Sequence, residues 1–147
     1  MAMPKSVTRV NKNGVKFISN VDRAQYTIRE LSRAALRDTA KLLRNRMTNK
    51  ARKLRGMGKS KRIRSTYQYW IRKREMDLVV GVKHATWYSQ HQELGTKGMP
   101  KKGIIRDTTF ENIDQIRIIQ GKYLSAIENE NLARGLIDES EVTGDSE

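Results

Sequence analysis

Apolar residues recur at helical spacing over the first third of the chain. The stripe consists of Ala24, Ile28, Leu31, Ala35 and Leu42, widened by Leu36, Leu43, Met47, Ala51 and Leu54. This period predicts a long helix over about residues 20–54. Ser19 and Asp22 match a capping box at its start, in which a hydroxyl and an acid satisfy free backbone N–H groups. Gly56 and Gly58 mark its end.

Shorter apolar runs predict strands on both sides of this helix. Residues 15–18 form one candidate strand. Residues 67–73 and 78–82 are rich in aromatic and β-branched side chains, so they predict the two strands of a hairpin. A tight connection at residues 74–77 joins these two strands.

The second half of the chain predicts two more helices. Residues 85–94 predict a short helix that ends at Gly95, followed by a glycine-rich loop. Thr108 and Glu111 match a second capping box, and apolar residues follow at helical spacing up to Ile127. The expected fold class is α+β, with a long N-terminal helix, a small antiparallel β-hairpin sheet, and a short helix and a C-terminal helix packed on it.

The composition predicts a thin hydrophobic core. Leu, Ile, Val and Phe make up 32 of the 147 residues. This fraction is just above the roughly 20 % at which charged chains stay disordered. The length is that of one domain. Partners that bury more of the surface would stabilise such a chain.

The net charge of +14 is unevenly distributed. Residues 39–74 contain fourteen Lys and Arg and no acid, whereas residues 128–147 contain seven acids and one base. The acidic segment is poor in apolar residues, so we expect it to be disordered. The expected organisation is a flexible polar arm at 1–14, a single α+β domain at 15–127 and a largely disordered acidic tail at 128–147.

Several classes of protein are excluded. The chain has no apolar run of about 18 residues, so no membrane-spanning helix is expected. The N-terminus leads into no apolar segment of a secretory signal. The absence of cysteine excludes disulfide scaffolds, thiolate zinc sites and cysteine nucleophiles.

Candidate catalytic chemistry is weak. His84, His91 and Glu93 are close in sequence, but no further ligand follows at a familiar metal-binding spacing. Residues 58–60 read Gly-Lys-Ser, as at the end of a phosphate-binding loop. However, the motif requires glycine where this chain has Lys53, and a basic helix precedes it in place of an apolar strand. We therefore expect no enzyme activity, no catalytic residues, no metal and no cofactor.

The run from Val80 to Thr96, followed by Met99-Pro100 and Ile104-Ile105-Arg106-Asp107, is similar to a small protein family of long-tailed bacteriophages. These are the head–tail joining proteins, also called neck, tail-completion or minor tail-component proteins. Their pattern is a strand ending in Val-Gly, an aromatic-bearing segment, Glu-aromatic-Gly-Thr, a loop with proline and a last helix. Here residues 93–96 read Glu-Leu-Gly-Thr, with leucine in the aromatic position. The similarity covers about residues 15–127.

The resemblance implies a structural virion protein. Such a protein forms an oligomeric ring in the neck and joins the DNA-filled head to the tail during viral tail assembly. The expected partners are further copies of the chain, a connector or head-completion protein, and a tail-terminator or tail-tube protein. Genomic DNA is an additional expected contact, and no membrane is involved. The expected location is the virion neck, and the host cytoplasm during assembly.

Two sets of residues are candidate contact surfaces. The expected subunit and partner interface comprises Trp87, Tyr88, His91, Glu93, Gly95 and Thr96. Gly95 can adopt a positive φ, and Glu93 can accept backbone N–H groups or pair with a base of a neighbouring subunit. The expected basic surface, which faces protein or DNA, comprises Arg52, Lys53, Arg55, Lys59, Lys61 and Arg62.

The basic composition leaves a second function open. A nucleic-acid-binding protein of the DNA or RNA chaperone type would account for the charge. Against it, Trp87 and Tyr88 lie in the least basic region, so no aromatic platform among the lysines is evident. Cations in the second half of the long helix also suit the helix dipole. Ring formation or presence in virions favours the first function, and salt-dependent DNA binding by the free monomer favours the second.

Overall fold

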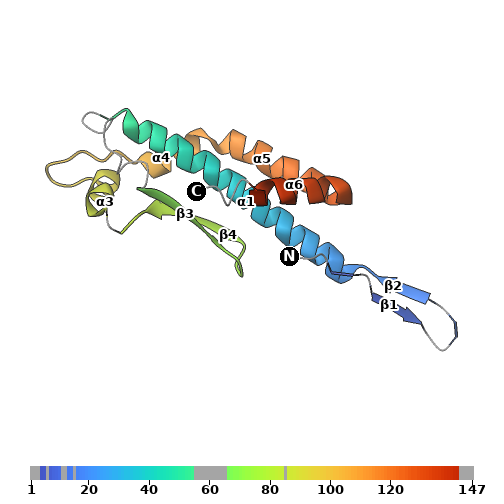
Figure 1. Ribbon diagram of the computed structural model, residues 1–147. Helices are drawn as coiled ribbons and strands as arrows, with labels where there is room; N and C mark the ends of the chain where they lie inside the picture. Colours follow the sequence, from blue (N-terminus) through green and yellow to red (C-terminus); the bar gives the residue numbers. More distant parts are fainter. Residues whose placement is uncertain are drawn as a thin grey trace.

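The computed structural model describes residues 4–5, 7–10, 13–14, 16–54, 66–84 and 86–142 (Figure 1). In chain order the elements are β1 (Val7–Val10), β2 (Lys16–Ser19), α1 (Val21–Arg52), β3 (Tyr67–Arg72), β4 (Asp77–Val82), α3 (Trp87–Leu94), α4 (Ile104–Glu111), α5 (Ile113–Ser125), the 3-10 turn η1 (Ala126–Glu128) and α6 (Glu130–Val142). The long helix, the two small antiparallel sheets and the shorter helices confirm the α+β class.

α1 is the central helix and confirms the predicted long helix. It runs for 32 residues, roughly 50 Å at the usual helical rise. The predicted capping box is wrong, because Ser19 is the last residue of β2 and its backbone is extended and paired. Asn20 takes the N-cap position instead, and no side chain in the described part of the chain caps the helix there. α1 ends at Arg52, and Gly56 and Gly58 lie outside the described residues.

The N-terminal half of α1 packs against the C-terminal helices. The buried residues of this cluster are Leu31, Ala34, Ala35, Tyr123, Ala126, Ala133 and Leu136. Four of them are alanines, and the distance between packed helices depends on the size of the side chains at the contact. The hydroxyl of Tyr123 donates to the carboxylate of Asp38, which links α5 to α1.

The C-terminal half of α1 packs against β3, β4 and α4. The buried residues of this second cluster are Leu43, Met47, Ala51, Tyr67 and Ile104. Half-buried apolar residues surround it, including Val80 and Val82 from β4 and Ile105 from α4. Among the described residues, six of the thirteen buried apolar side chains are alanines. The core is therefore thin, as the composition predicted.

β3 and β4 form the predicted hairpin. Their antiparallel register pairs Tyr67 with Val82 and Trp70 with Val79. Side chains alternate between the two faces of a strand. Tyr67 accordingly lies in the cluster on α1, whereas Trp70 lies on the outer face and is 72 % exposed.

A second hairpin lies where a flexible arm was expected. β1 pairs antiparallel with β2, from Val7 opposite Ser19 to Val10 opposite Lys16. The strand predicted at residues 15–18 is therefore present, shifted by one residue. The predicted domain boundary at residue 15 falls within this hairpin. The hairpin projects beyond the N-terminal end of α1, away from the β3–β4 hairpin and α3 (Figure 1).

Within the segment expected to be a largely disordered tail, residues 130–142 form α6. Ala133, Leu136 and Ile137 follow helical spacing and pack in the cluster on the N-terminal half of α1. The acids that dominate this segment of the sequence occupy exposed positions, such as Asp138 and Glu139. Residues 143–147 lie outside the described residues.

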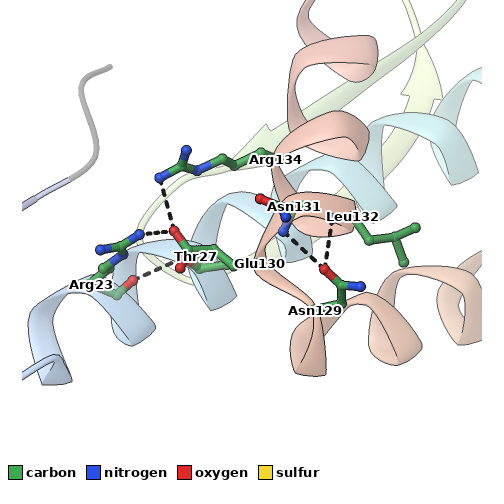
Figure 2. A network of polar contacts seen from close by, with 7 residues as sticks. All are labelled: Arg23, Thr27, Asn129, Glu130, Asn131, Leu132 and Arg134. Carbon is green, nitrogen blue, oxygen red and sulfur yellow. Dashed lines mark hydrogen bonds and ion pairs between the residues drawn. The ribbon is translucent and has the colours of Figure 1, made fainter.

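Polar contacts hold the start of α6 against α1 (Figure 2). The side-chain oxygen of Asn129 accepts the backbone N–H groups two and three residues further on, at 3.1 and 3.3 Å, and so caps α6. Glu130 forms ion pairs with Arg23 of α1 and with Arg134 of α6. The hydrogen bond from Arg23 is the main cause that lowers the pKa of the Glu130 carboxyl.

The second predicted capping box is also wrong. Thr108 and Glu111 lie inside α4, which begins at Ile104. The helix breaks at Asn112, whose side-chain amide donates to the carbonyl oxygen of Thr108 at 2.7 Å. The predicted last helix is therefore two helices, α4 and α5, because an asparagine at their junction competes for the backbone hydrogen bonds of the helix.

Replacing Leu136 tests whether α6 belongs to the folded domain. Leu136 is 7 % exposed, so Leu136→Ala is expected to lower the free energy of unfolding by about 2–3 kcal/mol. Leu132→Ala is the matched control, because Leu132 lies on the same helix but is 50 % exposed. Urea denaturation followed by circular dichroism measures both variants. Equal, small effects would contradict the packing of α6 on α1.

Candidate functional site

Glu93 joins α3 to α4. The N-cap of α4 is Gly103, which has no side chain to satisfy the first backbone N–H groups of the helix. Oε1 of Glu93 accepts the backbone N–H of Ile105 at 2.6 Å and fills this role from a neighbouring helix. A carboxylate at a helix N-terminus also interacts favourably with the helix dipole. The sequence suggested that Glu93 accepts backbone N–H groups or pairs with a base of a neighbouring subunit. The structure contains the first of these contacts.

The environment of Glu93 shifts its ionisation. Burial raises the pKa of the Glu93 carboxyl above its ordinary value. Hydrogen bonds from the backbone N–H groups of Ile105 and Ile104 oppose this rise, because they stabilise the carboxylate. The charge of Asp107 adds to the rise and that of Lys101 reduces it. The Glu93 carboxyl therefore holds its proton to a higher pH than an exposed glutamate does.

Gly95 ends α3 in a conformation that favours glycine, as predicted. Its φ is 80°, in a region that other residues rarely adopt. A Cβ atom built on Gly95 would lie 3.0 Å from the backbone nitrogen of Lys101. Thr96 and Met99 then exchange backbone hydrogen bonds of 2.9 and 3.1 Å. The segment from Glu93 to Thr96 is thus a closed turn that fixes the loop between α3 and α4.

The other residues of the expected interface differ in exposure. Tyr88 is half-buried, whereas His91 and Thr96 are exposed. Trp87 is the first residue of α3, and its side chain lies outside what the structure describes. Leu94, in the Glu-Leu-Gly-Thr segment, is 68 % exposed. An apolar side chain is therefore presented to solvent at the centre of the motif.

The described part of the expected basic surface is the end of α1. Arg52 and Lys53 are exposed there. The other four members of the set, Arg55, Lys59, Lys61 and Arg62, lie outside the described residues.

A polar hollow adjoins this end of α1. It lies between α1 and the junction of α4 and α5. Lys50 donates to the carboxylate of Glu111 at 2.7 Å, and Arg46 donates to the side chain of Gln115 at 3.4 Å. Part of the positive charge of α1 is therefore in contact with side chains of α4 and α5.

Sequence reasoning missed several exposed apolar side chains. Phe17 and Ile18 on β2 are 63 and 59 % exposed, and Trp70 on β3 is 72 % exposed. All three lie in two-stranded hairpins, in which the alternating pattern identifies two faces but not which face is covered. Exposed apolar side chains that gather in patches mark sites of interaction with other proteins.

The described residues contain no group of three His, Cys, Asp or Glu side chains arranged to hold a metal ion. Over the same part of the chain, no helix combines the length and the hydropathy that crossing a bilayer requires. The candidate contact surfaces of the described chain are the exposed apolar residues, the closed turn after α3 and the basic end of α1.

Comparisons of the chain with protein-family models, with curated proteins and with solved structures found no match. The function is therefore inferred from the sequence resemblance and from the surfaces described above.

Removing the Glu93 side chain tests its role as a cap. Glu93→Ala is expected to lower the free energy of unfolding by about 1 kcal/mol, because the N–H of Ile105 loses its acceptor. Glu93→Gln retains a carbonyl oxygen and should lose less. Gln90→Ala, an exposed position on the same helix, is the control for helix propensity. Chemical denaturation at neutral pH compares the three, and equal effects of Glu93→Ala and Gln90→Ala would argue against the cap.

The raised pKa of Glu93 also predicts a pH dependence. Between the ordinary carboxyl pKa and the raised value, the folded state binds more protons than the unfolded state. The stability of the wild type should therefore fall as the pH rises through this window. Glu93→Gln should show a smaller fall over the same range. Denaturant titrations across mildly acidic pH measure the two slopes, and identical slopes would be inconsistent with a buried Glu93 carboxyl.

Gly95 provides a test of the turn. Gly95→Ala places a Cβ on a left-handed backbone and against the backbone of Lys101, at a cost of about 1–2 kcal/mol or more. Gly98→Ala is the matched control, since Gly98 lies in the same loop with open space around its Cβ position. We expect a lower thermal midpoint for Gly95→Ala and little change for Gly98→Ala. A tolerated alanine at Gly95 would show that the turn is not fixed.

Proposed function

We propose that this protein is a structural subunit of the neck of a long-tailed bacteriophage. Copies of it form a ring between the connector of the DNA-filled head and the tail, and this ring joins the two during assembly. The proposal rests on the resemblance of residues 15–127 and on the surfaces that the fold exposes. The function of such a subunit is carried by contacts with its copies and with adjacent rings.

The projecting β1–β2 hairpin is the observation that carries the proposal. Val7, Phe17 and Ile18 are exposed on it, and within the described residues its extensive contacts are confined to its own two strands. A two-stranded hairpin is marginally stable on its own in water. A chain with such a hairpin is suited to an assembly in which another protein covers these side chains.

Exposed apolar side chains on other faces also favour assembly. Trp70 and Val79 form a cross-strand pair on the outer face of the β3–β4 hairpin. Ile118 and Leu124 are exposed on α5. These surfaces differ from the β1–β2 hairpin. A contact between the hairpin of one copy and one of these surfaces on another copy would therefore join unlike surfaces. Such heterologous contacts close into a ring when the rotation from one subunit to the next fits.

The nucleic-acid-binding alternative is supported by charge and weakened by the contacts of α1. The net charge of +14 attracts phosphate polymers. However, Lys50 and Arg46 already bind side chains of α4 and α5. For a DNA-binding monomer, each phosphate contact would add about 0.9 to the slope of log K against log salt.

Variants of the hairpin test the proposed function. In a phage that lacks its own copy of this gene, the wild-type chain should restore joined particles and be present in purified virions. Phe17→Ser with Ile18→Ser is expected to leave separate heads and tails in the electron microscope, because the apolar contact between copies is lost. Leu132→Ala, which changes an exposed apolar residue of α6, should behave as the wild type.

Two outcomes would contradict the proposal. One is a wild-type chain that is absent from purified virions. The other is normal joining of heads and tails without the protein, together with salt-dependent DNA binding by the free monomer, which would support the nucleic-acid-binding alternative.

A further inference from the structure

We infer that the apolar groove between α1 and the α5–α6 segment receives the β1–β2 hairpin of a second copy of this chain. This inference rests on the proposed ring and specifies the contact that would build it.

The groove consists of two adjoining hollows beside the N-terminal half of α1. Their volumes are about 270 and 240 Å³, and both are lined by Ile28 and Ile127. The first hollow is mainly apolar and includes Leu31, Leu36 and Leu124. The groove thus offers an extended apolar surface next to the start of α6.

The rim of the groove carries apolar side chains that face solvent. Ile28, Leu124 and Ile127 are 46, 66 and 42 % exposed. The charged residues of the second hollow, Arg23 and Glu130, pair with each other (Figure 2). The charges at this end are therefore neutralised within the chain, and an apolar occupant would not leave them unpaired.

The β1–β2 hairpin has the complementary chemistry. Its register places Val7 and Phe17 on one face of the sheet and Ile18 on the other. All three side chains are more than 40 % exposed. Each hairpin can therefore present one apolar face to the groove of a neighbouring copy.

The distribution of charge favours the contact between hairpin and groove over other contacts between two copies. The chain as a whole carries +14, so most contacts between two copies bring like charges together. Residues 1–19 contain four Lys and Arg and no acid, whereas residues 128–142 contain five acids and one Arg. Glu130 is already paired with Arg23 and Arg134, so the net negative charge of this segment comes from exposed acids such as Glu128 and, on α6, Asp138 and Glu139. A basic hairpin beside an acidic helix is attractive, and such complementarity suppresses wrong pairings.

The direction of the hairpin favours a second copy over the hairpin's own groove. α1 begins at Val21, directly after the hairpin, and the hairpin extends away from α5 and α6 (Figure 1). Each copy would thus provide a hairpin at one end and a groove along its side. The contact joins unlike surfaces and repeats from subunit to subunit, as a ring requires.

Disulfide trapping tests the contact, because the chain has no cysteine of its own. Phe17→Cys places a thiol on the hairpin and Ile127→Cys places one in the groove. Ile118→Cys is the matched control, since Ile118 is also apolar and exposed on α5 but does not line the groove. All three substitutions lie at exposed positions, so the fold should be retained, and circular dichroism checks this.

Oxidation of mixed single variants at high protein concentration should trap a heterodimer. We expect the yield from Phe17→Cys with Ile127→Cys to be at least several-fold above that from Phe17→Cys with Ile118→Cys. The double variant with cysteines at 17 and 127 should form a ladder of covalent oligomers. A monomer with an internal disulfide would overturn the inference in favour of a fold-back within one chain. Equal yields from the two mixtures would also overturn it.

The same disulfide is then sought in virions assembled from the double variant. A ladder from virions supports the inference. Virions that contain the chain without this disulfide overturn the inference and leave the proposed neck function intact. The wild-type chain is the control for incorporation, and its absence from virions contradicts the proposed function itself, whether or not the disulfide forms in solution.

Discussion

The burial of apolar surface against α1 is the interaction on which the rest of the structure depends. One cluster uses the N-terminal half of this helix and the other uses its C-terminal half, and α5 contributes Ile119 to the first and Ile116 to the second. Ala40, which is fully buried, lies between the two halves. Because so many of the buried side chains are alanines, each contact contributes little apolar area. The fold therefore requires a long uninterrupted helix, because α6 packs in the cluster on one half of it and β3 and β4 pack in the cluster on the other half.

The elements with a strong periodic signal were predictable. The stripe containing Leu31 and Met47 identified α1, and β-branched and aromatic residues identified the β3–β4 hairpin. Gly95 identified the end of α3, because few other residues adopt its backbone conformation. In each case the property is local, so the sequence around the position is sufficient to determine it.

The errors arose where a local signal was overruled by a distant contact. Ser19 has the right neighbours for a cap, but its backbone is in a strand because β1 pairs with it. The apolar spacing of Ala133, Leu136 and Ile137 is present in the sequence, yet the surrounding acids favoured disorder. Those three positions become a helix because α1 provides a surface for them. Burial against a partner element is not visible in a window of a few residues.

In the candidate site, too, the local features were predictable and the contacts with distant residues were not. Glu93 and Gly95 were identified as residues that shape a loop, and the structure contains the backbone contact of Glu93 and the positive φ of Gly95. The helix that Glu93 caps could not be foreseen, because the capped N–H belongs to Ile105, twelve residues further on. Phe17 and Trp70 were missed because their exposure depends on which sheet face the rest of the fold leaves open.

Acidic and basic residues are separated along the chain, so different parts of the subunit carry opposite charge. A uniformly basic subunit with a net charge of +14 would repel its copies in every orientation. Here α6, beside the N-terminal half of α1, holds four acids and one Arg, whereas Arg52 and Lys53 lie at the opposite end of α1. Screening limits such effects to about 10 Å at moderate salt, so only segments brought into contact feel them. Opposite charges on unlike surfaces then favour contacts that pair one end of a subunit with a different part of the next. Apolar burial supplies the affinity of such a contact, and charge determines its orientation.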